Sequence, residues 1–178
     1  LISFNNEKYI EHIVRSTLWT NELVIIDSGS TDSTLNIVRT IRPDAKIFFN
    51  KFDDFSTQRN LAIEKCQSEW ILHCDTDEQI PSDLKAEIAS EINNPNQTHS
   101  GFNLIRKYYW FDHRLSYIDG PNGMGAVIHR KPTARYTGTV HEKLIVNGPV
   151  KLLQHPIRHT CYDTIPERIT KLLKYRSS

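Results

Sequence analysis

The sequence predicts an α/β fold in which a mostly parallel sheet is flanked by helices. In the first half of the chain, short apolar runs alternate with segments whose apolar residues recur at helical spacing, as in βαβ units. The apolar runs end in polar or glycine-containing turns, which are typical of strand-to-helix connections. With 178 residues the chain is long enough for one domain with a substantial core.

The first predicted strand covers residues 1–4, and we expect it to begin upstream of Leu1. A helix follows, because apolar residues recur at helical spacing at Ile10, Ile13, Val14 and Leu18. The second strand, residues 22–26, ends in the turn of residues 27–32, whose glycine and small hydroxyl residues favour a tight connection. Residues 46–49 form the third strand, after a helix with apolar residues at Leu35, Val38 and Ile41.

The central stretch of the chain predicts a helix, a strand and an acidic loop. Residues 57–66 contain good helix formers, and the apolar run at residues 70–74 suits a buried strand that ends in the acidic residues 75–78. Ser82 is expected to cap the next helix, whose apolar residues recur at Leu84, Ile88 and Ile92. Farther along, the sequence predicts strands at residues 102–109 and 126–129, a glycine-rich loop at residues 119–125 and a final helix at residues 167–178.

The acidic loop places the carboxylates of Asp75, Asp77 and Glu78 at the end of a buried strand. Such groups repel one another and lose hydration, so they need a cation or a set of hydrogen-bond donors. Mg²⁺ or Mn²⁺ would compensate, since these ions prefer oxygen ligands and commonly take one or two protein carboxylates. The alternative is a solvated loop or the cap of the next helix. Because ligands bind beyond the carboxyl ends of strands in open α/β sheets, we expect Asn5 and Asp27 to share one rim with this loop.

Composition excludes several classes of protein. Hydrophobic residues make up 38% and charged residues 24% of the chain, as in globular rather than disordered proteins. A formal net charge of +1 provides no overall field for nucleic acid, so we expect no nucleic-acid partner. Three cysteines without C-x-x-C spacing argue against a disulfide framework and indicate a reducing, cytoplasmic compartment. The sequence contains no apolar run that approaches a membrane span, and we expect no signal peptide, although residues are expected upstream of Leu1.

Five motifs occur in an order that resembles a known family. They are the D-S-G-S-T-D turn at residues 27–32, Q-R-N-L-A at 58–62, the D-x-D stretch at 70–78, V-H-E-K-L at 140–144 and the final His159. This order resembles family 2 glycosyltransferases, and is most similar to the bacterial branch that includes lipopolysaccharide core glucosyltransferases. The resemblance covers nearly the whole chain and departs from the family at the N-terminus, where most of the first strand is missing.

The resemblance implies a GT-A (nucleotide-diphospho-sugar transferase) fold, with a Rossmann-like, mostly parallel sheet. It also implies a metal-dependent, inverting glycosyltransferase that moves a sugar from a nucleotide diphosphate sugar, with a UDP-sugar expected. The acceptor would be a glycan or glycolipid of the lipopolysaccharide-core type, and the cofactor Mg²⁺ or Mn²⁺. The enzyme would be cytoplasmic, with peripheral association at the inner face of the cytoplasmic membrane. Residues 1–100 would bind the donor nucleotide, and residues 101–178 would bind the acceptor and carry the catalytic base.

The donor-binding residues that the resemblance implies are Asn5, Asp27, Arg59, Asp75 and Asp77. Asp27 would accept a hydrogen bond from the base, and Arg59 would reach the base or the diphosphate. Asp75 would contact the ribose and Asp77 the metal, as the acids of the D-x-D motif do in the family. The alternative for Asp27 is a helix cap beside Ser30 and Asp32, and the alternative for Arg59 is a solvated helix residue.

The catalytic residue that the resemblance implies is Glu142, which would take the proton of the acceptor hydroxyl. Its neighbour His141 is a rival base or diphosphate contact, and the alternative for Glu142 is a surface ion pair with Lys143. His159 would complete the metal shell, although from the residues alone it is an ordinary partly buried histidine. The aromatic residues 108–111 suit either a sugar-stacking surface or the core.

Two other functions fit the same residues. A nucleotidyltransferase also holds Mg²⁺ with acids on an α/β sheet, but it would be expected to carry a glycine-rich phosphate loop near the first strand. A binding module could keep the nucleotide-sugar pocket without transferring the sugar.

Overall fold

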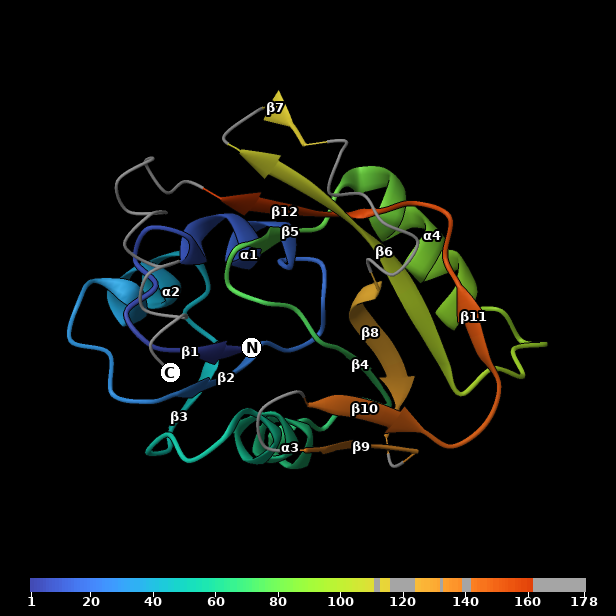
Figure 1. The fold of residues 1–178 in the computed structure, drawn as a ribbon, viewed down its shortest axis with the longest axis horizontal. Coiled ribbons are helices and arrows are strands. Elements are labelled where there is room, and N and C mark those ends of the chain that lie inside the picture. The colour runs from blue at the N-terminus through green and yellow to red at the C-terminus, as the bar shows by residue number, and fades with distance from the viewer. Residues whose placement is uncertain (111–112, 116–123, 132, 139–141, 162–178) are drawn as a thin grey trace.

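The computed structural model describes residues 1–110, 113–115, 124–131, 133–138 and 142–161 (Figure 1). The predicted loop at residues 119–125 lies mostly outside this part of the chain, and the predicted helix at residues 167–178 and His141 lie wholly outside it.

The first part of the chain forms a parallel sheet of three strands. The strands are β1 (Ile2–Ser3), β2 (Val24–Asp27) and β3 (Lys46–Phe49), and they pair in that order. They are connected by α1 (Ile10–Ser16) and α2 (Thr34–Ile41), so the predicted βαβ alternation is confirmed here. Whether the first strand extends upstream of Leu1 stays a prediction.

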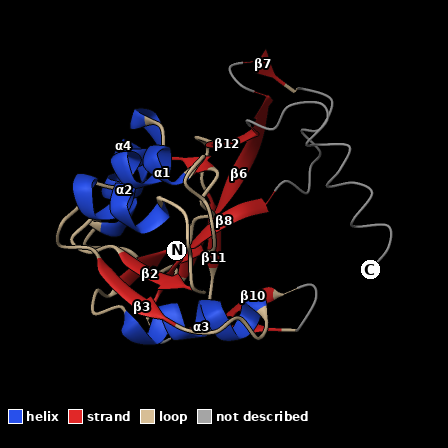
Figure 2. Ribbon diagram, turned by 90° about the vertical axis from the view of Figure 1, so that its left-hand side faces the viewer, coloured by secondary structure: helices blue, strands red, loops and turns tan. Residues whose placement is uncertain are grey.

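Helices cover both faces of this sheet. Figure 2 shows α1 and α2 on one face and α3 (Phe55–Lys65) on the other. The alternating residues of β2 explain this arrangement, because Ile25 packs in the cluster with α1 and α2, while Val24 and Ile26 pack against Ala62 of α3. All three β2 residues are buried, as a strand covered on both faces requires.

The second sheet is mixed rather than parallel. It contains β4 (Trp70–Leu72), β5 (Glu78–Gln79), β6 (Gly101–Trp110), β8 (Met124–Arg130) and β12 (Ile157–Cys161) in the order β4-β8-β6-β12-β5. Only the β6–β12 pair along this path is parallel. The mostly parallel sheet that the sequence predicts is therefore confirmed for the first sheet alone, because the partners of β4 and β5 come from residues beyond 100, where the βαβ alternation ends.

The remaining described strands either join the second sheet or form a separate ribbon. β7 (His113–Arg114) and β11 (Val150–Leu152) both pair with β6. β9 (Ala134–Thr137) and β10 (Lys143–Val146) form a separate antiparallel ribbon that contacts α3 (Figure 1).

The helix starts follow local hydrogen bonding. Asp54 caps α3, since its Oδ1 atom accepts a 2.7 Å hydrogen bond from the amide of Thr57. The predicted capping role of Ser82 is wrong, because the cap of α4 (Ser82–Ile92) is Pro81, which makes no side-chain cap hydrogen bond. Proline has a fixed φ that suits the entry to a helix.

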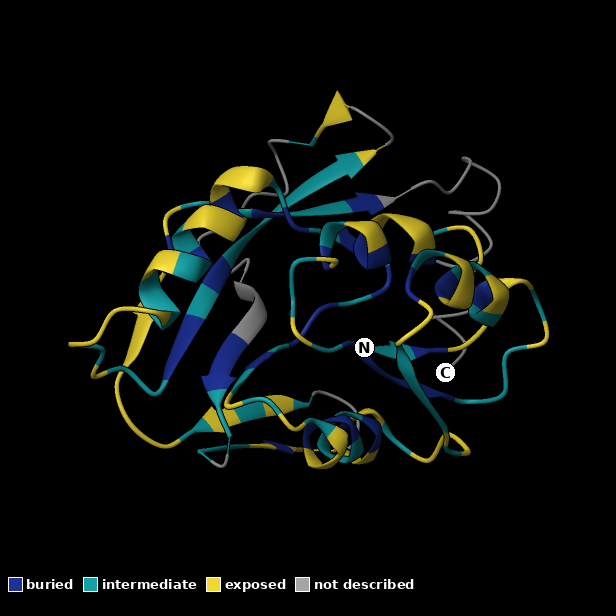
Figure 3. Ribbon diagram, turned by 180° about the vertical axis from the view of Figure 1, so that it is seen from behind, coloured by how far each residue is buried: buried dark blue, intermediate teal, exposed yellow. Residues whose placement is uncertain are grey.

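One hydrophobic core joins the two sheets. Its fully buried members include Ile13 of α1, Ile25 of β2, Leu84 of α4 and Phe102 of β6. Figure 3 shows the helices with buried residues on the inner side and exposed residues outside. The core spans both predicted halves of the chain; their division into donor and acceptor halves stays a prediction.

Glu22 makes a polar link between the sheets at the start of β2. Its Oε2 atom lies 2.9 Å from Lys46 Nζ at the start of β3. Its Oε1 atom accepts hydrogen bonds of 2.7 and 2.6 Å from the amides of Gln67 and Ser68, just before β4. Burial raises the pKa of Glu22, but these donors outweigh burial and lower the pKa to about 2.

Candidate functional site

The acidic loop after β4 lies where several distant elements meet. β5 pairs antiparallel with β12, which places His159 opposite Glu78 in the register. The amide of Thr160 donates a 2.9 Å hydrogen bond to the carbonyl of Asp77. The acidic loop is therefore held in place by β12, a strand from the end of the described chain. It is not a free, solvated turn.

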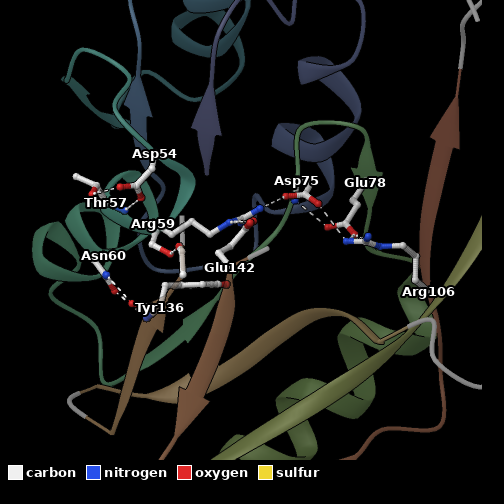
Figure 4. A network of polar contacts seen from close by, with 11 residues as sticks. Asp54, Thr57, Arg59, Asn60, Asp75, Glu78, Arg106, Tyr136 and Glu142 are labelled. Atoms are coloured by element: carbon white, nitrogen blue, oxygen red, sulfur yellow. Dashed lines mark hydrogen bonds and ion pairs between the residues drawn. The ribbon is translucent and has the colours of Figure 1, made fainter. Parts of the chain in front are cut away.

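Asp75 is held by two arginines from different elements (Figure 4). Its Oδ1 atom lies 2.7 Å from Arg59 Nη2 on α3, and its Oδ2 atom lies 3.1 Å from Arg106 Nη2 on β6. Burial raises the pKa of Asp75, but the two positive charges outweigh burial, so the pKa lies below its ordinary value. Asp75 is therefore an ionised hydrogen-bond acceptor at neutral pH.

Arg59 also reaches Glu142, which precedes β10. The Nε atom of Arg59 lies 3.3 Å from Oε1 of Glu142, and its guanidinium lies 5.4 Å from the centre of the Tyr136 ring. The Arg59 side chain is only 14% exposed, so Arg59 is not a solvated helix residue. The arginine thus bridges Asp75 and Glu142 across the two sequence halves.

The neighbours of Arg59 in the Q-R-N motif fix its helix in place. Gln58 is buried and donates a 3.0 Å hydrogen bond to the carbonyl of Asn50, beyond β3. Asn60 exchanges two hydrogen bonds with the backbone of Tyr136 on β9, each 2.9 Å long (Figure 4). These contacts attach α3 to both the first sheet and the β9–β10 ribbon, and so direct Arg59 toward the acidic loop.

Glu78 is the most buried acid of the loop. Its side chain has no exposed surface, and its Oε1 atom lies 2.6 Å from Arg106 Nη2. Its Oε2 atom accepts a 2.8 Å hydrogen bond from the amide of Asp75. Burial and the nearby charge of Asp75 raise the pKa of Glu78 to about 7, with Arg106 opposing the rise.

The predicted metal residues lie side by side. Asp77 Oδ1 lies 3.3 Å from His159 Nδ1, and this buried oxygen accepts no hydrogen bond from the described residues. Burial raises the pKa of Asp77, and His159 partly offsets the rise. Within the described ranges no group of three or more His, Cys, Asp or Glu side chains is arranged for a metal. The pair fits Mg²⁺ or Mn²⁺ because such ions fill their remaining positions with water and phosphate oxygens.

Asn5 and Asp27 meet at the end of the first sheet, whereas the predicted rim shared with the acidic loop stays a prediction. Asp27 Oδ1 accepts hydrogen bonds from the amides of Gly29 and Ser30, and its Oδ2 accepts from the hydroxyls of Ser3 and Ser30. The amide of Asn5 donates to the same Ser30 hydroxyl at 2.9 Å, and Asn5 has a φ of 50°. Asp27 therefore holds the turn after β2. It is not a helix cap, since the cap of α2 is Ser33 and Asp27 binds the amides of Gly29 and Ser30 instead; its contact with a nucleotide base stays a prediction.

Arg106 is the residue of this cluster that the sequence reasoning missed. The signal lies in the period-2 pattern of β6, where Phe102 and Leu104 are fully buried on one face and Arg106 comes next on that face. A guanidinium on the core side of a strand requires acidic partners. Along the same strand, Tyr108 packs edge-on against His159 and Trp110 is 36% exposed, so these aromatic residues lie outside the hydrophobic core.

A cavity of 540 Å³ lies elsewhere, between β2, β4 and α4. Leu23, Val24, Trp70, Leu72 and Ile88 are among the residues that line it. None of the charged residues of the acidic loop cluster borders it, so the cluster and not the cavity is the candidate site.

Comparisons with known proteins point in one direction. The model of a family described as glycosyl transferase family 2 matches residues 1–138. The SPbeta prophage-derived glycosyltransferase SunS of Bacillus subtilis is 37% identical over 91 residues, which cover 50% of this chain and 22% of SunS. The lipopolysaccharide core biosynthesis glycosyltransferase LpsC of Rhizobium meliloti is 24% identical over 155 residues, which cover 84% of this chain and 57% of LpsC.

Solved structures show the same fold. TarS of Staphylococcus aureus, residues 1–349 in complex with UDP-GlcNAc, has a TM-score of 0.62 at 16% identity, with 92% of this chain and 58% of that chain covered. The same protein in complex with UDP has a TM-score of 0.63 at 17% identity, with 90% and 59% covered. The chain spans between 22% and 64% of the length of the first curated relatives that it matches.

Proposed function

The chain belongs to glycosyl transferase family 2 and has the GT-A fold, and on this basis we propose that it transfers a sugar from a nucleotide diphosphate sugar to an acceptor hydroxyl. The observation that carries the proposal is the position of Arg59, which joins Asp75 to Glu142. The donor-binding acid and the proposed base thus share one cation and lie on either side of it.

We infer that the donor is a UDP-sugar. The support is that TarS has been solved with UDP and with UDP-GlcNAc, and that a glucosyl-3-phosphoglycerate synthase of Mycobacterium tuberculosis, with a TM-score of 0.50, has been solved with Mg²⁺ and UDP. Asp75 can still accept hydrogen bonds from ribose hydroxyls, since each of its two oxygens has a second lone pair beyond the one that an arginine uses. Asn5 and Asp27 would border the base at the end of the first sheet.

Asp77 and His159 would hold a Mg²⁺ or Mn²⁺ ion, which when bound stabilises the negative charge on the leaving diphosphate. The buried Asp77 oxygen without a hydrogen bond in the described part of the chain supports this assignment. Arg59 would contribute a second positive charge beside Asp75.

Glu142 would act as the general base of a single displacement. Its carboxylate would take the proton of the acceptor hydroxyl as the new bond forms between that oxygen and the anomeric carbon. The bond between the anomeric carbon and the diphosphate would break, and the diphosphate would leave with the electron pair. A single displacement inverts the anomeric configuration.

The acceptor proposed is a glycan or glycolipid of the lipopolysaccharide-core type, with the LpsC similarity as support. Among the described residues, no helix combines the length and apolar composition that a membrane crossing requires. Cytoplasmic location and peripheral association with the membrane remain part of the proposal.

The variant Glu142→Gln tests the proposal against a binding module that has lost transfer. It keeps the size of the side chain and removes its basicity, so UDP-sugar binding should persist while transfer falls by roughly 10² to 10⁴-fold. Calorimetry with Mn²⁺ measures UDP-sugar binding. The release of free UDP in the presence of a panel of glycan acceptors measures transfer of the sugar. His141→Asn tests the rival base in parallel. Full-rate transfer by Glu142→Gln would remove Glu142 from the mechanism, and a product with the retained anomer would overturn the single displacement.

A further inference from the structure

Arg106 occupies a position where a charge is costly. It follows Phe102 and Leu104 on the inward face of β6, and its side chain is 20% exposed. A guanidinium in such a place needs close acidic partners to offset the loss of hydration. Its partners, Glu78 and Asp75, both belong to the acidic loop.

Arg106, Glu78 and Asp75 are all in contact with one another (Figure 4). Arg106 Nε and Nη2 lie 2.8 and 2.6 Å from Glu78 Oε1, and Nη2 also lies 3.1 Å from Asp75 Oδ2. The other oxygen of Glu78 accepts the 2.8 Å hydrogen bond of the Asp75 amide. Arg106 therefore fixes the side chain of Asp75 directly and its backbone through Glu78.

Arg59 and Arg106 hold Asp75 in different ways. Arg59 connects Asp75 to Glu142, in the other half of the chain, whereas Arg106 connects it to Glu78 within the same loop. If Arg59 turns toward a donor diphosphate, Arg106 is the cation that keeps Asp75 in place. The same set of contacts also spans Asp77, which lies between the two acids that Arg106 joins.

We propose that Arg106 is a positioning residue, which orients Asp75 and the acidic loop for the donor nucleotide. The proposal rests on the proposed function, since it assigns Asp75 to the donor. A purely structural arginine would neutralise buried charge without affecting the donor. If the arginine positions Asp75, donor affinity should also fall in a variant that keeps the positive charge but lacks the forked guanidinium.

Three variants separate these roles. Arg106→Lys keeps the charge but puts a single ammonium group in place of Nε and Nη2, which together hold Glu78 while Nη2 also reaches Asp75. We therefore expect uridine diphosphate affinity with Mn²⁺ to fall roughly tenfold, as for loss of a hydrogen bond to a charged group. Glu78→Gln combined with Arg106→Gln removes the buried charges together, and donor affinity should stay below that of wild type because Asp75 Oδ2 has lost its charged donor. Arg42→Lys is the matched control, since Arg42 is buried against Thr17 and Thr20 and away from the acidic loop; it should lower thermal stability and leave donor affinity unchanged.

Hydrogen exchange of the Asp75 amide gives a second readout that needs no ligand. We expect this amide to exchange roughly tenfold faster in Arg106→Gln, because its acceptor Glu78 is no longer held. Donor affinity restored to wild type in the double variant, or an unchanged Asp75 exchange rate in Arg106→Gln, would overturn the positioning role. If the wild-type protein binds no uridine nucleotide, the proposed function fails, and the exchange measurement alone decides whether Arg106 orders Asp75.

Discussion

Arg59 lies between two carboxylates that serve different steps of the proposed reaction. In Arg59→Ala, Asp75 and Glu142 lose a shared cation, and the donor loses a charge-assisted partner. We expect uridine diphosphate binding to weaken by about 1.5–3 kcal/mol, the range for hydrogen bonds to charged groups. Arg59→Lys should recover only part of the loss, because a point charge replaces a fork.

Calorimetric titration with Mn²⁺ measures the effect of Arg59. Arg39→Ala is the control, since Arg39 is an exposed arginine in the last turn of α2 and should leave affinity unchanged. Wild-type affinity in Arg59→Ala would mean that the arginine supports the fold alone.

We expect the dependence of uridine diphosphate binding on Mn²⁺ to require Asp77. Two phosphates cannot approach this group of acids closely without a cation between them. We expect uridine diphosphate to bind wild type more tightly with Mn²⁺ than with a chelator, and Asp77→Asn to lose most of that difference. Asp83→Asn, an exposed acid in the first turn of α4, should behave as wild type. Equal affinities for wild type and Asp77→Asn with and without Mn²⁺ would rule out this role.

At the scale of single residues, the acids, Arg59 and His159 could be named from the sequence, but Arg106 was missed. Asp75 and Asp77 stand in a recognisable motif, and Arg59 and His159 follow from the family resemblance, while Arg106 comes from a strand whose pairing is fixed only in the folded chain. Arg106 could have been found from the period-2 pattern of β6, in which it shares a face with Phe102 and Leu104.

Glu22 shows how one side chain can join separate elements. Because its pKa in the folded protein is about 2, against an ordinary value of 4.5, the unfolded chain binds the proton more readily. Its contribution to the free energy of unfolding is therefore fully present above pH 4.5 and lost as the pH falls toward 2. The contribution is on the order of 2–3 kcal/mol.

Glu22→Gln should therefore be less stable than wild type at pH 7, and the difference should narrow below pH 4.5. Urea unfolding between pH 7 and 3 measures this. Glu11→Gln is the control, since Glu11 forms an exposed pair with Arg15 in α1 and should change stability by less than about 1 kcal/mol. A difference for Glu22→Gln that stays constant over this range would contradict the assignment.

Helices and the first three strands could be predicted because their apolar pattern is local. The buried positions of α1 recur at helical spacing at Ile10, Ile13 and Val14, and β3 is a short apolar run with Ile47 and Phe48 partly buried. The pairing of β4 with β8, and of β5 with β12, joins residues far apart in sequence, and local pattern does not specify such a register. The cap at Ser82 was mispredicted because proline at position 81 can begin a helix without a side-chain acceptor.

The whole molecule assembles its charged cluster from both halves of the chain. Arg59 and Glu142 are 83 positions apart in the sequence, and Glu78 and Arg106 are 28 positions apart. Contacts of such separation form only when both sheets have docked on the common core. Nucleotide binding should therefore report complete folding, and a fragment that ends at residue 100 lacks Arg106, Glu142 and His159.

The two hydrogen bonds between Asn60 and Tyr136 also affect whether copies of the protein associate with one another. The outer edge of β9 carries backbone groups that could pair with a strand of another copy, and the Asn60 amide occupies the donor and the acceptor of Tyr136 on that edge. Asn60→Ala should expose this edge and increase self-association, which light scattering over a concentration series would detect. Asn36→Ala, at an exposed position of α2, should leave scattering at the wild-type level. An Asn60→Ala protein that stays monomeric at all concentrations would show that α3 shields the ribbon without the help of this side chain.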